Sequence, residues 1–308
     1  MKILLLGCNG QVGWELQRSL QPLGDLVACD FDTPGEYRAD FSEPEAVAAL
    51  VARVAPQVIV NSAAHTAVDK AESEPELARL INATTPCAIA EAAQKLGALL
   101  VHYSTDYVYD GSGSAPRTET ALTGPLSVYG STKLEGEDLI RASGARHVIL
   151  RTSWVYAARG NNFIKTMLRL AAERDALSVI DDQIGAPTGA DLLADVTAQV
   201  IAKITADAHG GKALSGKALG GTFHCVAAGE TSWFDYARFV IEWARAQGQP
   251  FKVAPDGVRP VPTSAYPTPA ARPLNSRLST AKLCETFSLN LPDWRVGVER
   301  MLRETCGR

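Results

Sequence analysis

The sequence of 308 residues has no apolar run close to the roughly 20 residues that a membrane-spanning helix needs. It begins directly with a core-type apolar segment at residues 2–6 instead of a signal peptide, so we expect a cytoplasmic protein with no membrane partner. The net charge is −4 and basic residues form no run. Nucleic acid is therefore not expected as the main partner.

Spacings typical of disulfide frameworks and zinc sites are also missing. The six cysteines include no Cys-x-x-Cys pair, so we predict free thiols in a reducing compartment. The five histidines are scattered and form no His-Glu-x-x-His motif. The sequence therefore predicts neither a structural nor a catalytic zinc.

A glycine-rich turn follows the first apolar segment. Gly7, Gly10 and Gly13 lie between residues 2–6, which read as a strand, and residues 14–20, which read as a helix. In this order, glycines permit a tight turn and a close approach of the backbone to a pyrophosphate, and the helix N-terminus attracts phosphate. The pattern predicts a dinucleotide site, although glycines alone could mark only a turn.

Asp30 ends the next apolar strand, at residues 26–29. A carboxylate at this position accepts the adenosine ribose 2′-hydroxyl in Rossmann units, which favours NADH. A site for NADPH would need a cation nearby, whereas a phenylalanine and an aspartate follow Asp30. Arg18 or Arg38 could still supply that cation, and the simplest alternative is that Asp30 only caps a loop.

Tyr129 and Lys133 are four residues apart, so a helix would place them on one face. An unperturbed tyrosine has a pKa of about 10, and a neighbouring ammonium lowers it by stabilising the phenolate. Thr105, at the end of an apolar strand, could hydrogen-bond the same substrate oxygen. Tyr-x-x-x-Lys also occurs by chance on solvated helix faces, but beside a nucleotide motif it predicts proton transfer.

Apolar strands alternate with helix-like segments along the chain, which predicts an α/β protein with a Rossmann-type doubly wound parallel sheet. Residues 1–155 would form the NAD(P)-binding domain, with part of 177–228 completing the sheet. Residues 156–308 would form a smaller substrate-binding lobe interleaved with it. Further strands are expected at residues 58–60, 98–103, 147–156, 177–180 and 222–226, helices at 44–54, 82–96, 163–174, 191–204 and 233–247, a loop at 207–221, and an irregular proline-rich cover at 250–273.

Together the motifs resemble the extended short-chain dehydrogenase/reductase superfamily and, within it, the dTDP-4-dehydrorhamnose reductase family. Tyr-x-x-x-Lys and the glycines are typical of the superfamily, whereas Val-Asp-Lys-Ala-Glu, Arg-Thr-Ser-Trp-Val-Tyr and Arg-Pro-x-Asn-Ser point to the reductases. The resemblance covers nearly the whole chain. Its motifs lie at residues 7–16, 40–41, 61–72, 104–109, 129–133, 151–156, 161–163, 182–189 and 272–278.

The resemblance implies that the 4-keto group of dTDP-4-dehydro-L-rhamnose is reduced by NADH or NADPH. Tyr129 would protonate the substrate oxygen, Thr105 would stabilise it, and Lys133 would keep the tyrosine pKa low and hold the nicotinamide ribose. Asp106 and Trp154 would face the sugar, although a core position is the usual one for a tryptophan. The residues expected to bind the cofactor are Gly7, Gly10, Gln11, Val12, Asp30, Asp40, Phe41, Ala64, His65, Thr66, Tyr103, Tyr129 and Lys133.

Family members form dimers bridged by Mg²⁺, and Glu15 and Asp191 could supply carboxylates here. Arg295, however, stands where a further acidic ligand is expected, and a cation there would weaken binding of Mg²⁺. A homodimer is therefore one option for the assembly, a Mg²⁺ bridge is doubtful, and we predict no metal ligand.

Three other interpretations remain open at this stage. The chain could be a 4,6-dehydratase or 4-epimerase of the same superfamily, although Asp106 and Tyr107 replace the Asp-Glu pair of such dehydratases. It could be a non-catalytic NADP-binding regulatory subunit, against which the intact Thr105, Tyr129 and Lys133 argue. It could also be an NAD-binding Rossmann protein with an unrelated substrate.

Overall fold

The computed structural model describes residues 1–210 and 219–306 and contains a six-stranded sheet in the order β10-β5-β4-β3-β1-β2. Every neighbouring pair of strands is parallel, which confirms the predicted parallel sheet. The last strand to join it, β10, confirms the predicted return of the chain to the sheet. The strands are β1 (Lys2–Leu6), β2 (Asp25–Cys29), β3 (Val58–Asn61), β4 (Leu99–Thr105), β5 (Arg146–Thr152) and β10 (Gly221–His224).

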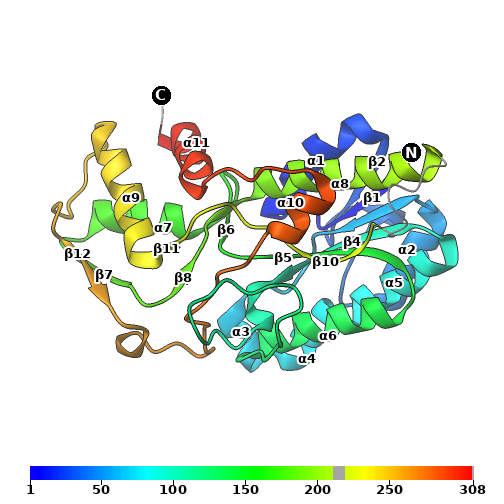
Figure 1. Ribbon diagram of the computed structural model, residues 1–308, viewed down its shortest axis with the longest axis horizontal. Coiled ribbons are helices and arrows are strands. Elements are labelled where there is room, and N and C mark those ends of the chain that lie inside the picture. Colours follow the sequence, from blue (N-terminus) through cyan, green and yellow to red (C-terminus); the bar gives the residue numbers. More distant parts are fainter. Residues whose placement is uncertain (211–218, 307–308) are drawn as a thin grey trace.

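Helices cover both faces of this sheet (Figure 1). Alternate strand residues point to opposite faces, so Ile3 and Leu5 of β1 pack in one core cluster and Leu4 and Leu6 in another. The first face carries α1 (Gln11–Leu20), α8 (Ala190–Gly210) and α10 (Ala281–Phe287). The second face carries α2 (Pro44–Val54), α5 (Thr85–Leu96) and α6 (Val128–Ala142).

The strand order reverses at β1, which has β2 on one side and β3 on the other. In an open α/β sheet, such a reversal leaves a crevice at the carboxyl ends of the strands where ligands bind. Gly7 directly follows β1 with a φ of +82°, and a Cβ there would lie 2.6 Å from the backbone nitrogen of Ala63. Only glycine fits the turn, because any side chain would collide with the segment that follows β3.

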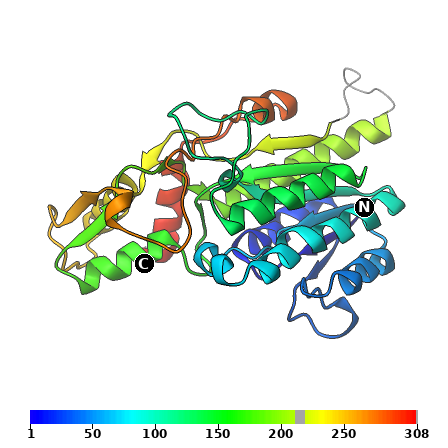
Figure 2. The same ribbon diagram turned by 90° about the horizontal axis from the view of Figure 1, so that it is seen from below.

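A second group of elements lies at the other end of the molecule from β2 and α2 (Figures 1 and 2). Its aromatic core includes Tyr236 and Trp294, whose ring centroids are 5.6 Å apart. Three two-stranded sheets accompany its helices. The elements are α7 (Phe163–Glu173), α9 (Trp233–Ala246), α11 (Trp294–Cys306), β6 (Val155–Tyr156) with β9 (Thr188–Gly189), β7 (Leu177–Ile180) with β12 (Val258–Val261), and β8 (Ile184–Gly185) with β11 (Thr231–Ser232).

Short elements connect these layers. Between β3 and α5 lie α3 (Val68–Ser73), α4 (Pro75–Arg79) and a π-helical turn, η3 (Leu80–Thr84). Short 3₁₀ turns are η1 (Gln21–Leu23), η2 (Gly35–Tyr37), η4 (Asp106–Val108) and η6 (Thr263–Ala265). The described cysteines are all free thiols, as predicted. Within the described residues, no helix is both long enough and apolar enough to cross a membrane.

The structure corrects several predicted boundaries. The strand predicted at residues 147–156 is broken into β5 and β6 because Trp154 adopts a φ of +50°, which no strand tolerates. The helix predicted at 191–204 continues to Gly210, so the start of the predicted loop at 207–221 is helical. Residues 211–218 of that predicted loop lie outside the described residues, and its last residue, Gly221, begins β10.

Two further predictions also need correction. The proline-rich cover at residues 250–273 contains a strand, β12, which pairs in parallel with β7. Pro260 can sit in it because a strand of a two-stranded sheet has one edge without a ladder partner. The helix predicted at 82–96 begins as the π-helical turn η3 before α5 continues it.

A buried ion pair joins α6 to β5. Glu137 and Arg151 are 0% and 3% exposed, and the guanidinium donates to both carboxylate oxygens at 2.8 and 2.6 Å. Burial acts to raise the pKa of Glu137, but the bonds from Arg151 hold it below its usual value. Arg151 also donates to the Tyr109 hydroxyl at 2.6 Å. The pair fixes α6 against the sheet, because breaking it would leave an unpaired buried charge.

We predict that Glu137→Gln lowers the free energy of unfolding by about 3–5 kcal/mol, since it leaves the Arg151 guanidinium buried without a counter-charge. Glu135→Gln is the matched control, because Glu135 pairs with Arg79 on the exposed side of the same helix and should cost less than about 1 kcal/mol. Thermal or urea unfolding of both variants measures the difference. Equal effects would show that the buried pair does not anchor α6.

Candidate active site

Thr105 ends β4, and Tyr129 and Lys133 lie on the first turns of α6, so the two segments bring the three predicted catalytic residues to the carboxyl edge of the sheet. The start of α6 is fixed from two sides. The Ser127 hydroxyl accepts from the backbone N–H of Gly130 at 3.2 Å, and Glu72 accepts from that of Val128 at 2.9 Å. These caps satisfy backbone donors that a helix N-terminus leaves free.

Two glycines let α6 approach its neighbours closely. A Cβ on Gly130 would lie 2.3 Å from the carbonyl oxygen of Tyr107, and one on Gly136 would lie 2.2 Å from that of Asn82. The Asn82 side chain also donates to Thr132 at 3.1 Å. The glycine in Tyr-Gly-x-x-Lys therefore has a structural reason, because a larger residue would push Tyr129 away from the loop after β4.

Lys133 is buried, with 2% of its surface exposed. Its Nζ donates to the carbonyl oxygen of Tyr103 at 2.6 Å and lies 3.3 Å from Nε2 of His102. Burial lowers the pKa of Lys133 to about 8, although the charge of Glu137 one turn further along α6 acts to raise it. Its amine can therefore change its protonation state near physiological pH.

Tyr129 is half-buried, and its ring meets that of Tyr107 edge to face at a centroid distance of 5.6 Å. Burial raises the pKa of Tyr129 to about 12, and the neighbouring Thr105 hydroxyl offsets part of that rise. The spacing of Tyr129 and Lys133 predicts a lowered pKa for Tyr129. The structure corrects this expectation, because burial dominates and the Lys133 amine is directed to Tyr103.

Asp106 is 2% exposed and lies directly after Thr105. The Thr105 hydroxyl donates to one carboxylate oxygen of Asp106 at 3.1 Å, and the other oxygen has no hydrogen-bond partner. Burial raises the pKa of Asp106 to about 6, against the lowering effects of the Ser276 and Thr105 hydroxyls. A buried carboxylate oxygen without a partner is a group that a sugar hydroxyl could satisfy.

The glycine-rich turn delivers the N-terminus of α1 to the same edge. Gly10 is the N-cap of α1 and provides no side-chain cap, and Gln11 and Val12 form its first turn. That turn holds no acidic residue, so its free backbone N–H groups face no competing negative charge. A Cβ on Gly13 would lie 1.9 Å from the carbonyl oxygen of Gly7, so this glycine allows α1 to pack against the turn.

Asp30 follows β2 and accepts backbone hydrogen bonds from Asn9 and Phe31, each at 2.8 Å. Its carboxylate therefore orients the glycine-rich turn and retains lone pairs for another donor. Arg38 lies nearby, where it donates to the carbonyl oxygen of Phe31 at 3.1 Å and to Asp40 at 2.6 Å. The other carboxylate oxygen of Asp40 accepts from the backbone N–H and from the hydroxyl of Ser42.

The remaining predicted cofactor residues divide into two groups. Ala64, His65 and Thr66 follow β3, and the backbone N–H of His65 donates to Asn82 at 2.8 Å. Phe41 and Tyr103, in contrast, place their rings in the core. The Tyr103 hydroxyl bonds Thr197 of α8 at 2.5 Å, so this residue reaches Lys133 only through its carbonyl oxygen.

Trp154 is partly buried and stacks on Trp233, with ring centroids 3.7 Å apart and an angle of 17° between the planes. Its positive φ is strained for a bulky side chain, and such strain is concentrated at functional sites. A Cβ on Gly185 would lie 2.9 Å from the indole, so this glycine makes room for the ring. The two indoles thus form a platform between β5 and the second group of elements.

Comparison with known proteins agrees with this arrangement. The profile described as the RmlD substrate binding domain matches residues 1–306. A dTDP-4-dehydrorhamnose reductase of Escherichia coli K12 is 57% identical over 304 residues, which cover 99% of this chain and 98% of that protein. The chain belongs to the dTDP-4-dehydrorhamnose reductase family.

Solved structures of family members have the same fold. The reductase of Clostridium acetobutylicum is 36% identical with a TM-score of 0.86, and each chain is covered to 99%. The reductase of Bacillus anthracis, solved in complex with NADP, is 35% identical with a TM-score of 0.84 and the same coverage of both chains. The predicted family and fold are therefore confirmed.

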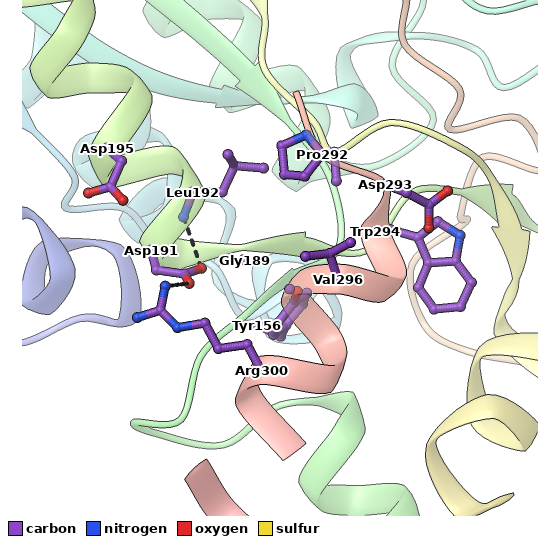
Figure 3. A pocket seen from close by; sticks show the side chains of 12 residues that line it. Tyr156, Gly189, Asp191, Leu192, Asp195, Pro292, Asp293, Trp294, Val296 and Arg300 are labelled. Atoms are coloured by element: carbon purple, nitrogen blue, oxygen red, sulfur yellow. Dashed lines mark hydrogen bonds and ion pairs between the residues drawn. The ribbon is translucent and has the colours of Figure 1, made fainter. Parts of the chain in front are cut away.

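A separate cavity of about 210 Å³ lies between α8 and α11, and its lining includes none of the three predicted catalytic residues (Figure 3). Asp191 faces it and pairs with Arg300 at 3.1 Å, while the half-buried Glu15 has a pKa raised by partial burial and by Asp191. Arg295 pairs with Asp293 at 3.1 Å. Across residues 1–210 and 219–306, no cluster of three or more acidic, histidine or cysteine side chains could hold a metal ion.

Several residues around the site were not predicted. His102 and Asn61 form a buried chain of contacts with Lys133, and Glu72 and Asn82 hold α6 in place. A histidine inside the apolar run of β4 is a signal that could have been used. Strand alternation places it on the same face as Leu100, which is the face that α6 covers.

We predict that Asp106→Asn becomes more stable relative to the wild type as pH rises from 4 to 7. The pKa of Asp106 is higher in the folded chain than in the unfolded one, so the folded state binds more protons between these values and the wild type loses stability as pH increases through this window. A rise of about two units corresponds to about 3 kcal/mol.

Thermal unfolding at several pH values measures this difference. Asp256→Asn is the matched control on an exposed aspartate, and its stability should follow that of the wild type throughout. A pH-independent difference between Asp106→Asn and the wild type would contradict the assignment of a raised pKa to this carboxyl.

Proposed function

We propose that the protein reduces the 4-keto group of dTDP-4-dehydro-L-rhamnose with NADH or NADPH to give dTDP-L-rhamnose. One observation carries the proposal: Thr105, Tyr129 and Lys133 gather at the carboxyl edge of a sheet whose strand order reverses beside a glycine-rich turn. The family relatives bear the name of this reductase, and one of them is bound to NADP. The dTDP-sugar is the expected partner.

The residues at this edge fit a dinucleotide. The uncapped N-terminus of α1 at Gly10 and Gln11 suits a pyrophosphate, and Gly7 allows the backbone to come close. Asp30 suits a ribose hydroxyl, and the adjacent Arg38 provides the cation that a 2′-phosphate would need. These neighbours are consistent with use of either cofactor. When bound, the dihydronicotinamide supplies a hydride for the carbonyl carbon.

Tyr129 is the proton donor in this proposal. Its raised pKa keeps the phenol protonated at neutral pH, and an alkoxide that develops on the sugar is a stronger base than phenolate. The Thr105 hydroxyl, beside Tyr129, hydrogen-bonds the same oxygen and stabilises its charge. Lys133 in its ammonium form, one helical turn away, stabilises the phenolate that Tyr129 leaves.

Asp106 and Trp154 are proposed to contact the sugar. Asp106 offers a buried carboxylate oxygen that has no partner within the protein, which suits a sugar hydroxyl. Trp154 offers an apolar ring, stacked on Trp233, which suits the face of a deoxysugar. Assembly as a homodimer and a location in the cytoplasm remain predictions from the sequence.

We predict that Tyr129→Phe lowers kcat by a factor on the order of 10² or more, because the ring still packs but the proton donor is lost. The assay follows nicotinamide absorbance with dTDP-4-dehydro-L-rhamnose and either cofactor, and cofactor binding should be almost unchanged. Tyr107→Phe removes the same hydroxyl from the adjacent ring and should change kcat less than about tenfold. A normal kcat for Tyr129→Phe would refute the proposed role.

We also predict that Trp154→Ala raises the KM for the dTDP-sugar while the melting temperature stays near that of the wild type. A fully buried tryptophan replaced by alanine costs about 3–5 kcal/mol, whereas a partly exposed one that lines a site should cost much less. Trp294→Ala is the matched control, because Trp294 is 2% exposed and should lose that full amount. A strongly lowered melting temperature with an unchanged KM would show that Trp154 is a core residue and does not contact the sugar.

A further inference from the structure

Asn61, His102 and Lys133 form a buried row across β3, β4 and α6. They are 1%, 1% and 2% exposed. The Asn61 side-chain nitrogen lies 3.1 Å from Nδ1 of His102, and Nε2 of the same ring lies 3.3 Å from Nζ of Lys133. The proposed mechanism uses only Lys133, so a buried histidine and a buried amide in contact with it require an explanation.

The orientation of Asn61 is fixed by its backbone neighbour. The N–H of Ala63 donates to the amide oxygen of Asn61 at 3.0 Å, and a backbone N–H can only donate. The oxygen therefore faces Ala63, and the NH₂ group faces His102. Because that NH₂ group can only donate, Nδ1 of His102 must accept and carries no hydrogen.

The tautomer of His102 follows from this contact. Burial is the larger of the two causes that hold the pKa of His102 well below its usual 6.5, and it acts whether or not Lys133 is charged, so the ring is neutral and has one N–H. Since Nδ1 accepts, that hydrogen is on Nε2 and points at Nζ of Lys133. An ammonium has no lone pair to accept it, whereas a neutral amine has one and can still donate to the Tyr103 carbonyl.

We propose that Asn61 and His102 are positioning residues for Lys133: Asn61 fixes the His102 ring as the Nε2–H tautomer, and the ring donates that hydrogen to Lys133 in its neutral amine form. This inference rests on the proposed function only in that Lys133 serves Tyr129. If Lys133 gained a proton, its ammonium would face the Nε2–H of His102 with no acceptor between them. The clash would be relieved only if the Asn61 amide turned and lost its bond with Ala63. The row therefore favours release of a proton from Lys133.

Two other charged or titratable groups, Glu137 and Tyr129, lie near Lys133 on α6. Glu137, on α6, favours the ammonium, although its own charge is largely neutralised by Arg151 from β5. Tyr129 lies one turn before Lys133 on the same helix. The His102 ring nitrogens meet Asn61 and Lys133 and bond neither of these two groups, so Asn61 fixes which ring nitrogen accepts.

The direct test is the tautomer of His102 in the full chain labelled with ¹⁵N-histidine. Long-range ¹H–¹⁵N correlation distinguishes the two neutral tautomers of each of the five histidines, and the signal lost in His102→Gln identifies His102. We expect the Nε2–H form in the wild type above about pH 8, where Lys133 is the neutral amine. An Nδ1–H form or a charged ring would overturn the proposal.

Asn61→Asp reverses the contact, because a carboxylate can only accept and so draws the hydrogen to Nδ1. His102 should change to the Nδ1–H tautomer, its Nε2 should accept from the Lys133 ammonium, and the alkaline limb of the kcat profile should move up by about one pH unit or more. Asn290→Asp, the same change on an exposed residue, should alter neither measurement. An Nε2–H ring or an unmoved limb in Asn61→Asp would refute the role of Asn61.

The spectra separate this inference from the proposed function. If Asn61→Asp does not fold, the wild-type spectrum still decides the tautomer. If the wild type does not reduce the dTDP-sugar, the proposed function fails, and the tautomer of His102 still supports or overturns the buried row.

Discussion

The burial of one lysine amine is the constraint on which this site depends. Lys133 lies beneath the carboxyl edge of the sheet, where its Nζ binds the Tyr103 carbonyl and contacts His102. A buried ammonium is costly unless its partners compensate, so these contacts and the charge of Glu137 together decide its protonation state. The same position keeps Lys133 one turn from Tyr129, which links the protonation of the two residues.

Helix α6 carries both the stability of the fold and the chemistry of the site. Tyr129, Lys133 and Glu137 follow one another at four-residue spacing, so one face of the helix holds the proposed proton donor, the amine and the buried anion. Glu137 fastens that face to β5 through Arg151, and Gly136 brings it close to Asn82. A shift of the helix would therefore disturb the anchor and the proposed catalytic residues together.

Much of this arrangement could be predicted from the sequence, because strand alternation, glycine positions and the Tyr-x-x-x-Lys spacing are local patterns. The strand, turn and helix around Gly7 and the approach of Thr105 to Tyr129 are of this kind. The break at Trp154 could not be predicted, since neither its positive φ nor its stacking on the distant Trp233 follows from a local pattern. The direction of the Tyr129 pKa also depends on burial, which spacing does not reveal.

The site depends on the protonation state of Lys133, which titration of its side-chain nitrogen measures. In the full chain with ¹⁵Nζ-labelled lysine, the resonance absent from Lys133→Met reports this amine alone. We expect a midpoint near pH 8, since burial lowers the pKa of Lys133 to about 8. A midpoint at about 10.4, which is the pKa of an exposed lysine, would show that burial does not lower the pKa of Lys133.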